Sequence, residues 1–350
     1  MEKISLEWQI GGKMKALQLI GKEKFKFAEV PKPEIKADEV LLKIKKVGIC
    51  GTDLHIYHGG MKVPLPLIMG HEFVGDVAEV GLDVTNVKVG DRAVAEHVIG
   101  CGNCTFCNFG KCNLCIKPTV IGLHRPGALA EYVAIPARLV YRLPDELTYD
   151  DGVLVEPLSI AVYGIRRAGV GVGDNVVVVG QGTIGLFIDQ VAKAAGASVC
   201  GIDVMQPRLD YASKKQLVDI ALNSKNGDVA EKYKKETNYA GADVVFEVVG
   251  RDETIDLSLS IARPDGKVAV LGVFEHDASI NMMDIVKKEL HVLGSWTCLN
   301  SFEPTLHLLA NKHILTDGLI THRYKFADTP KAFIDASSYS DNRIKSAIEF

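Results

Sequence analysis

The sequence lacks the features that would point to a membrane, a nucleic acid or a fibrous role. No apolar run approaches the roughly 20 residues that a helix needs to cross a bilayer, and there is neither a tandem repeat nor a low-complexity segment. The formal net charge of −4 gives no basic field to attract phosphate backbones. The first 13 residues have no apolar core and do not predict a secretory signal. We therefore expect a cytoplasmic protein with no nucleic-acid or membrane partner.

What is present is a globular composition whose pattern changes near residue 165. The 350 residues are 47% hydrophobic and 24% charged, and their number suffices for two domains. Earlier residues alternate short β-rich runs with Gly, Pro and Asp turns, which is typical of a compact β barrel; the runs are 40–47, 73–80, 92–95 and 132–135.

Strand–helix units follow. They consist of helical stretches such as 184–195 between apolar runs at 175–179, 198–204, 242–249 and 267–273. This alternation indicates a parallel sheet covered on both faces. A helix near 302–312 and a strand near 345–350 complete the expected elements.

A GxGxxG loop in the second half predicts a dinucleotide site. Gly180 would permit a tight turn after the strand, Gly182 would let a pyrophosphate approach, and Gly185 would let helix and strand pack closely. Asp203, at the end of the next expected strand, can accept both ribose hydroxyls and would repel a 2′-phosphate, although it could also only cap the following helix. The sequence therefore favours NAD over NADP, a preference that the nearby Arg208 tempers.

Five of the eight cysteines crowd between Cys101 and Cys115, which indicates a metal site rather than disulfides. Cys101, Cys104, Cys107 and Cys115 supply four thiolates, and a zinc ion saturated by four thiolates is structural. Cys112 is either a bystander or a competitor of Cys115 for the fourth position; we favour Cys115.

A second set is dispersed along the chain and comprises Cys50, His71, Glu72 and Glu156. Each residue alone has an ordinary structural explanation. Together they supply one thiolate, one imidazole and two carboxylates, enough for a catalytic zinc that keeps one position open for substrate.

From about Met14 onward the chain resembles the zinc-containing medium-chain alcohol dehydrogenases, in particular their sorbitol and threonine dehydrogenase branch. The resemblance rests on Cys50–His55, Gly70–Glu72, the four-cysteine loop, Glu156–Leu158 and the glycine-rich loop. It implies an α/β fold: a GroES-like β-rich catalytic domain in residues 1–163, completed by 302–350, and a Rossmann domain with a doubly wound parallel sheet in 164–301. It also implies two zinc ions per chain and a homodimer or homotetramer.

The resemblance further implies roles for individual residues. Cys50 and His71 would hold the catalytic zinc, with Glu72 and Glu156 completing or exchanging at it. Thr52 and His55 would relay the proton of the substrate alcohol, unless Thr52 only bonds its local backbone and His55 only faces solvent. Asp53 would orient its neighbours. The expected cofactor contacts are Gly180, Gly182, Thr183, Ile184, Gly185, Asp203, Arg208, Leu271, Val273, Ser295 and Thr297.

The substrate is less clearly indicated. Polyol dehydrogenases carry an aromatic residue directly after the relay histidine, where this chain has Ile56 and then Tyr57. His97 is similar to a residue of threonine dehydrogenases, and Trp296 would either cover the pocket or pack the domain interface. We expect a hydride transfer between NAD(H) and a secondary alcohol or ketone of a polyol, sugar or sugar acid, with L-threonine oxidation as the alternative.

Two other classes remain open at this point: a zinc-free reductase and a binding protein without turnover. The four-cysteine loop and the pair of Cys50 and His71 argue against the first. The intact relay and ligand residues argue against the second.

Overall fold

Strands dominate the first half of the chain in the computed structural model, which describes residues 12–237, 241–338 and 342–350. A three-stranded sheet is ordered β2-β1-β4, and a seven-stranded sheet runs β10-β6-β5-β3-β18-β17 with β9 also paired to β3. The bounds are β1 Lys13–Gly21, β2 Lys24–Pro31, β3 Glu39–Ile49, β4 Leu67–Ile68, β5 Glu72–Val80, β6 Arg92–Ala95, β9 Tyr132–Pro136 and β10 Val140–Arg142. The four predicted β runs of this half are therefore confirmed.

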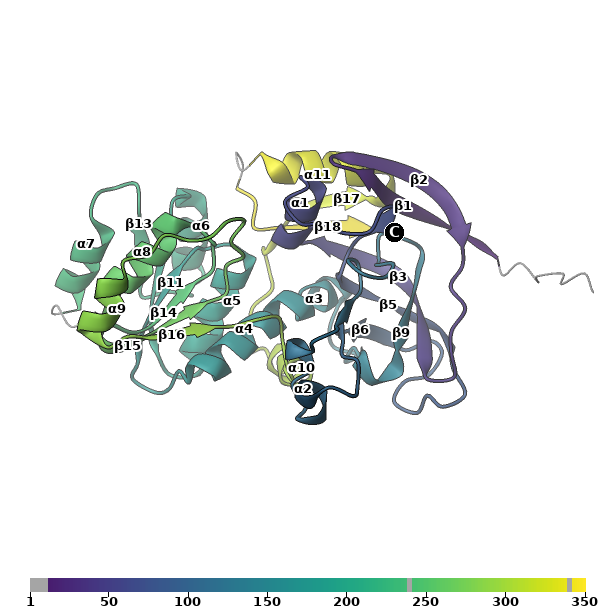
Figure 1. The fold of residues 1–350 in the computed structure, drawn as a ribbon, viewed down its shortest axis with the longest axis horizontal. Helices are drawn as coiled ribbons and strands as arrows, with labels where there is room; N and C mark the ends of the chain where they lie inside the picture. The colour runs from purple at the N-terminus through teal and green to yellow at the C-terminus, as the bar shows by residue number, and fades with distance from the viewer. Residues whose placement is uncertain (1–11, 238–240, 339–341) are drawn as a thin grey trace, which may run out of the picture.

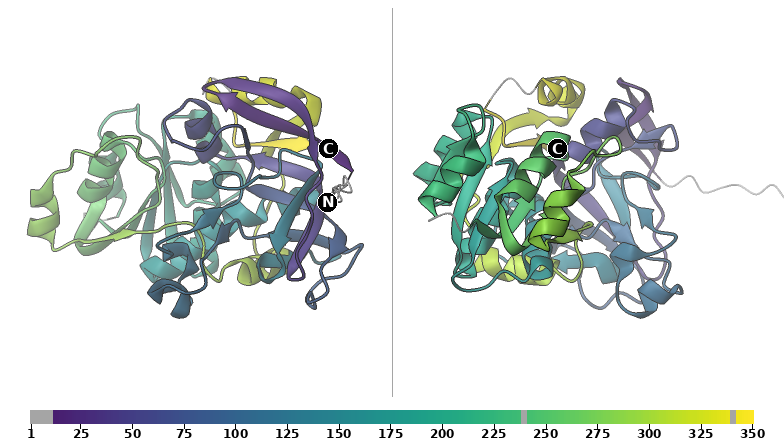
Figure 2. Two further views of the ribbon diagram at one scale, coloured as in Figure 1. Left: turned by 45° about the vertical axis from the view of Figure 1, so that its right-hand side comes forward. Right: turned by 60° about the vertical axis from the view of Figure 1, so that its left-hand side comes forward.

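The last strands of the chain join this first sheet. β17 (Ile320–Lys325) runs parallel to β18 (Lys345–Glu349), and β18 pairs antiparallel with β3, with Ser346 opposite Ile49. Figures 1 and 2 show the C-terminal elements, including α11 (Thr329–Ser337), beside the N-terminal strands in every view. The pairing brings residues near position 345 next to the segment that begins at Cys50.

The second unit is a six-stranded parallel sheet ordered β13-β12-β11-β14-β15-β16. The chain runs outward from β11 to β13 and returns to β14 on the other side of β11, so the sheet is doubly wound. Its strands are β11 Asn175–Val179, β12 Ser198–Asp203, β13 Ile220–Asn223, β14 Ala242–Glu247, β15 Ala262–Val270 and β16 His291–Gly294. Ligands of such sheets bind where the winding direction changes, at the carboxyl ends of the strands.

Alternate residues of β11 explain the layers of this unit. Val176 and Val178 pack with residues of α4 (Val155–Ala168), α5 (Thr183–Ala194) and α6 (Gln206–Lys214). Val177 and Val179 pack with residues of α7 (Val229–Glu236), α8 (Asp252–Ile261) and α9 (Met282–Lys288). A strand buried on both faces therefore reads as a continuous apolar run, which is why this sheet could be predicted.

One hydrophobic cluster connects the two units. It includes Val74 of β5, Leu158 of α4, Val178 of β11 and Phe302 of α10 (Phe302–Ala310). The predicted α/β fold class, a β-rich unit beside a doubly wound parallel sheet, is confirmed. Within the three described ranges, no helix combines the length and apolarity needed to cross a membrane.

Candidate active site and metal centres

The sulfur atoms of four cysteines gather in the loop after β7 (Val98–Ile99). Those of Cys101, Cys104, Cys107 and Cys115 lie within 4.8 Å of one another, and Cys112 is outside this group. The loop turns through α2 (Thr105–Asn108) and a short 3-10 helix, Cys112–Leu114. Backbone N–H groups, first that of Cys107, lower the pKa of Cys104 to about 6. Four sulfur atoms this close, one readily ionised, fit a closed tetrahedral zinc site.

The donor atoms of Cys50, His71 and Glu72 form a second group within 4.8 Å. The register of β3 and β5 explains why: Gly48 lies opposite Glu72, so the residue after β3 and the residue before β5 meet at one edge of the sheet. Cys50 is the N-cap of α1 (Gly51–Tyr57), while His71 and Glu72 are buried at 4% and 1% exposure. Three protein donors are one fewer than the four that fill a tetrahedral zinc site, so one position at the metal stays open for a substrate.

Anionic groups surround the imidazole of His71. Asp53 accepts a hydrogen bond from the backbone N–H of Cys50 at 2.9 Å and lies 3.4 Å from Nδ1 of His71. Burial opposes the charged imidazolium, yet Asp53 and Cys50 outweigh it and raise the pKa of His71 well above its ordinary value. A buried pocket that attracts a proton this strongly fits a metal cation, and Asp53 lies beside the imidazole nitrogen that it is expected to orient.

Lys345 enters the same site from β18, and no local sequence pattern predicts it. Its side chain is 3% exposed and forms an ion pair with Oε2 of Glu72. Gly48 makes this pair possible, because a Cβ at that position would lie 2.8 Å from Cε of Lys345 and closer still to Glu72. Only the pairing of β18 with β3 places this cation beside the ligand group.

Glu156 lies outside the three-residue group, in the first turn of α4. Its Oε1 is 3.3 Å from Nδ1 of His97, and both side chains are buried. Burial, and then the charge of Glu72, raises the pKa of Glu156 to about 8. Burial and the neighbouring His71, whose ring centre is 5.1 Å away, lower the pKa of His97 to about 3.

Helix α1 carries both predicted relay residues. Thr52 and His55 are three residues apart and therefore share one face of the helix. Nδ1 of His55 is 2.5 Å from Oε1 of Glu275, which lies in the segment after β15, and the imidazole is 25% exposed. His55 thus contacts the parallel-sheet unit instead of merely facing solvent. Glu275 was missed because nothing in the sequence relates it to position 55.

The glycine-rich loop connects β11 to α5, with different constraints at its three glycines. Gly180 has a φ of +107°, a region that other residues rarely adopt. A Cβ on Gly185 would lie 1.8 Å from the carbonyl oxygen of Gly180. At Gly182 the nearest neighbour of a Cβ would be Arg208, at 4.0 Å, so the backbone is open there. Thr183 is buried and donates to the carbonyl of Ile344, while Ile184 is half-buried.

Asp203 stands at the end of β12 and holds the loop. Its carboxylate accepts hydrogen bonds from the backbone N–H of Gln181 at 2.6 Å and of Met205 at 2.7 Å. Arg208 lies 3.6 Å from the same carboxylate and donates to the carbonyl of Arg343. Asp203 therefore bonds the backbone of the glycine-rich loop and of Met205. Helix α6 receives no side-chain cap hydrogen bond, so the alternative that Asp203 caps this helix is wrong.

Leu271 and Val273 follow β15, and Ser295 and Thr297 follow β16, so all four lie at the carboxyl edge of the sheet. The hydroxyl oxygens of Ser295 and Thr297 are buried without a hydrogen-bond partner among the described residues. Thr297 has a φ of +54°, which costs a β-branched residue roughly 1–2 kcal/mol. Buried unpaired hydroxyls on a strained turn fit a polar ligand such as a nicotinamide carboxamide.

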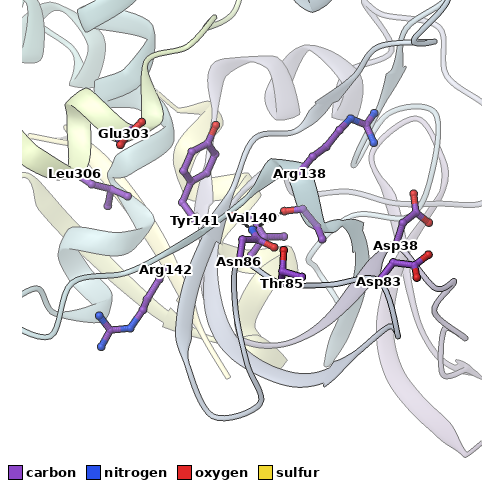
Figure 3. A pocket seen from close by; sticks show the side chains of 11 residues that line it. Asp38, Asp83, Thr85, Asn86, Arg138, Val140, Tyr141, Arg142, Glu303 and Leu306 are labelled. Atoms are coloured by element: carbon purple, nitrogen blue, oxygen red, sulfur yellow. Dashed lines mark hydrogen bonds between the residues drawn. The ribbon is translucent and has the colours of Figure 1, made fainter.

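Burial distinguishes two aromatic residues, Tyr57 and Trp296. Tyr57 is 6% exposed and stacks on Phe25, with ring centres 5.2 Å apart, so it belongs to the core. Trp296 is 56% exposed and does not pack the interface between the units. A cavity of about 730 Å³ lies between β10 and α10, and Asn86, Tyr141 and Glu303 are among the residues that line it (Figure 3). None of the predicted site residues lines this cavity.

Comparison with known proteins shows which family the two units resemble. Residues 36–145 match the alcohol dehydrogenase GroES-like domain, and residues 183–311 match the zinc-binding dehydrogenase domain. The chain is 32% identical to a sorbitol dehydrogenase of Bacillus subtilis over 340 residues, 95% of this chain and 96% of that one. It is 35% identical to an L-threonine 3-dehydrogenase of Salmonella newport over 334 residues, 91% of this chain and 95% of that one.

The fold agrees with solved structures. Galactitol-1-phosphate dehydrogenase from Escherichia coli has a TM-score of 0.89 and 29% identity, with 96% of this chain and all of that one covered. Other structural neighbours were solved with NADH or NADP bound. The fold and the two cysteine-containing centres therefore define a zinc- and nicotinamide-dependent oxidoreductase that acts on CH–OH groups. The chain belongs to the zinc-containing medium-chain alcohol dehydrogenase family.

Proposed function

We propose that this protein transfers a hydride between NAD(H) and a secondary alcohol or ketone of a polyol, sugar or sugar acid. The observation that carries the proposal is the group of Cys50, His71 and Glu72, the last two buried, at the start of α1. His55 of the same helix reaches the parallel-sheet unit. Similarity to sorbitol and galactitol-1-phosphate dehydrogenases supports the substrate class. When bound, zinc would polarise the substrate oxygen and the dinucleotide would take up the hydride.

We propose that Cys50, His71 and Glu72 hold the catalytic zinc, and that Cys101, Cys104, Cys107 and Cys115 hold the structural one. Glu156 lies outside this group, with its Oε1 3.3 Å from Nδ1 of His97, and the charges of Glu72 and His71 act on it. Its proposed role is to exchange with Glu72, whose negative charge Lys345 balances from the other side. Because both carboxylates are buried beside one another, a single ligand position can serve them in turn.

The substrate proton would leave through Thr52 and His55. A carboxylate can only accept, so Nδ1 of His55 must donate its hydrogen to Glu275. Nε2 is then left as the acceptor, the tautomer that a relay toward Thr52 requires. Glu275 therefore serves as a positioning residue for the imidazole and offers the next acceptor on the way to solvent.

We propose NAD as the cofactor. Gly180, Gly182, Thr183, Ile184 and Gly185 would cradle the pyrophosphate at the start of α5, with Arg208 beside Gly182. Asp203, held in place by two backbone N–H groups, would accept the ribose hydroxyls. Leu271, Val273, Ser295 and Thr297 would contact the nicotinamide.

For the whole molecule we propose the domain boundaries 1–163 with 302–350 and 164–301, which the pairing of β18 with β3 supports. We also propose a homodimer or homotetramer in the cytoplasm. The exposed edge strand β16 could pair with a second copy, and a four-thiolate centre is stable where thiols stay reduced. A monomer in light scattering would contradict the oligomer.

The experiment is NADH formation across a panel of polyols and sugar acids, with L-threonine included and matching ketones tested in reverse. We expect turnover with a polyol or sugar acid that is lost when the metal is removed and restored by zinc. Turnover with L-threonine alone would favour the second candidate, which the Salmonella relative and the buried His97 support. Absence of turnover with zinc and NAD both bound would reject the substrate class.

A further inference from the structure

We infer that Asn113, in the four-cysteine lobe, is a positioning residue for the nicotinamide, acting through the turn that carries Ser295 and Thr297. This inference rests on the cofactor site proposed above. Asn113 lies in the 3-10 helix between Cys112 and Cys115 and is 4% exposed. Its Nδ2 donates to the carbonyl of Trp296 at 3.1 Å and to the hydroxyl of Tyr163 at 3.3 Å.

The turn that Asn113 contacts adopts a shape that its sequence disfavours. Thr297 and Asn300 both have left-handed backbones, with φ of +54° and +49°, and neither is glycine. Such conformations persist only where surrounding contacts impose them. The carbonyl that Asn113 binds belongs to Trp296, which lies between the two buried, unpaired hydroxyls of Ser295 and Thr297. Holding this carbonyl therefore sets the direction of both hydroxyls.

Two arginines hold the ends of the same turn. Arg167 donates to the carbonyl of Gly294, and Arg166 donates to that of Asn300 at 2.9 Å. Both project from α4, the helix that also carries Glu156 and Tyr163. Glu156 and Tyr163 are seven residues, about two turns, apart and so lie on one side of α4. Hydrogen bonds thus hold the turn at three carbonyls. The middle one comes from Asn113, whose side chain is buried.

This arrangement gives the four-cysteine lobe a function besides local folding. The lobe has little core of its own. A bound metal would fix the position of the 3-10 helix, because this helix lies between the proposed ligands Cys107 and Cys115. Asn113 extends from that helix onto α4 and the nicotinamide turn. The lobe therefore preorganises the cofactor pocket, and weakening its contact should reduce cofactor affinity more than the rate of the chemical step.

The test is NADH affinity of Asn113→Ala, measured by fluorescence titration on the purified full-length protein. We expect a Kd for NADH at least about fivefold weaker, from the loss of a buried donor. The KM for NAD should rise with it, with the KM for the alcohol unchanged and kcat reduced by less than about twofold. Asn86→Ala is the matched control, since the Asn86 amide also donates to two carbonyls, those of Ala137 and Val140, and neither belongs to the turn.

Arg166→Ala provides a second variant at an exposed position that leaves the core intact, and it should also weaken NADH binding. Unchanged NADH affinity in both Asn113→Ala and Arg166→Ala would overturn the inference while leaving the proposed function in place. Equal weakening in Asn86→Ala would overturn it too, since the effect would then be a general loss of stability. Failure of the unmodified protein to bind NADH would instead reject the proposed cofactor site.

Discussion

At the scale of single residues, charged side chains from distant parts of the chain lie beside the proposed zinc ligands and relay: Lys345 pairs with Glu72, and Glu275 contacts His55. Cys50, His71 and Glu72 could be predicted because their residue types match zinc chemistry. Lys345 and Glu275 could not, because each acquires its partner only when distant strands or loops come together. Sequence patterns thus identify donors of a metal site, whereas the charges that balance them emerge from the tertiary fold.

Glu275 offers a direct test of the relay. Glu275→Gln should lower kcat by roughly three- to tenfold and shift its pH dependence, because the amide can also donate and no longer enforces one tautomer of His55. NADH affinity should stay the same. Asp277→Asn, an exposed acid in the same segment, is the control for nonspecific charge effects. An unchanged pH profile in Glu275→Gln would remove this residue from the relay.

Substitution of Glu156 distinguishes a role in exchange at the metal from a purely structural role. Glu156→Gln should keep zinc bound through Cys50, His71 and Glu72, yet reduce kcat by about 10- to 100-fold, because the exchanging carboxylate is lost. Zinc content by mass spectrometry and steady-state kinetics measure the two quantities. Full zinc content together with full activity would withdraw Glu156 from the centre.

At the scale of elements, two substitutions in the glycine-rich loop separate an effect on cofactor binding from an effect on folding. Gly182→Ala should fold normally, since its Cβ would have no neighbour closer than 4.0 Å, but the methyl would stand where the pyrophosphate approaches. We expect an NADH Kd at least about tenfold weaker at unchanged Tm. Gly185→Ala, whose Cβ would collide with the Gly180 carbonyl, should lower Tm as well. Tight NADH binding by Gly182→Ala would contradict the placement of the phosphates.

The elements themselves were predictable where apolar periodicity was strong. β11 and β6 have the predicted bounds, whereas β15 begins at Ala262 and ends at Val270 instead of spanning 267–273. The pairing with β14 passes from Ala262 directly to Lys267, so the polar, turn-like residues 263–266 lie outside it, at a register shift. β13 and β16, the two edge strands of the sheet, were not predicted, because their residues are exposed or half-buried and form no continuous apolar run.

At the scale of the whole molecule, an ion cluster ties the C-terminal strands to the first unit. Asp150 pairs with Lys46 of β3 and Arg323 of β17, and both cations also contact Glu349 of β18. Hydrogen bonds, first from Arg323, lower the pKa of Asp150 to about 2. The cluster joins Lys46 to Glu349, which are 303 residues apart in sequence.

The lowered pKa of Asp150 determines how the stability of the folded state depends on pH. The cluster stabilises the folded state fully above the ordinary aspartate pKa near 4, and that stability is lost as pH falls toward 2. Because Asp150 is partly exposed, we expect Asp150→Asn to lower Tm at neutral pH by only roughly 1–3 °C. The difference from the unmodified protein should vanish near pH 2. A constant difference across this range would refute the assignment, and Asp145→Asn controls for a local surface pair.

The central claim is that the centre of Cys50, His71 and Glu72 binds the zinc at which the alcohol reacts. The most direct measurement is NADH formation by Cys50→Ser with the best substrate of the panel, with zinc content and NADH binding measured on the same sample. We expect one zinc per chain in Cys50→Ser and two in the unmodified protein, normal NADH binding, and turnover reduced by at least about a thousandfold. Two zinc ions per chain, or turnover near that of the unmodified protein, would contradict it.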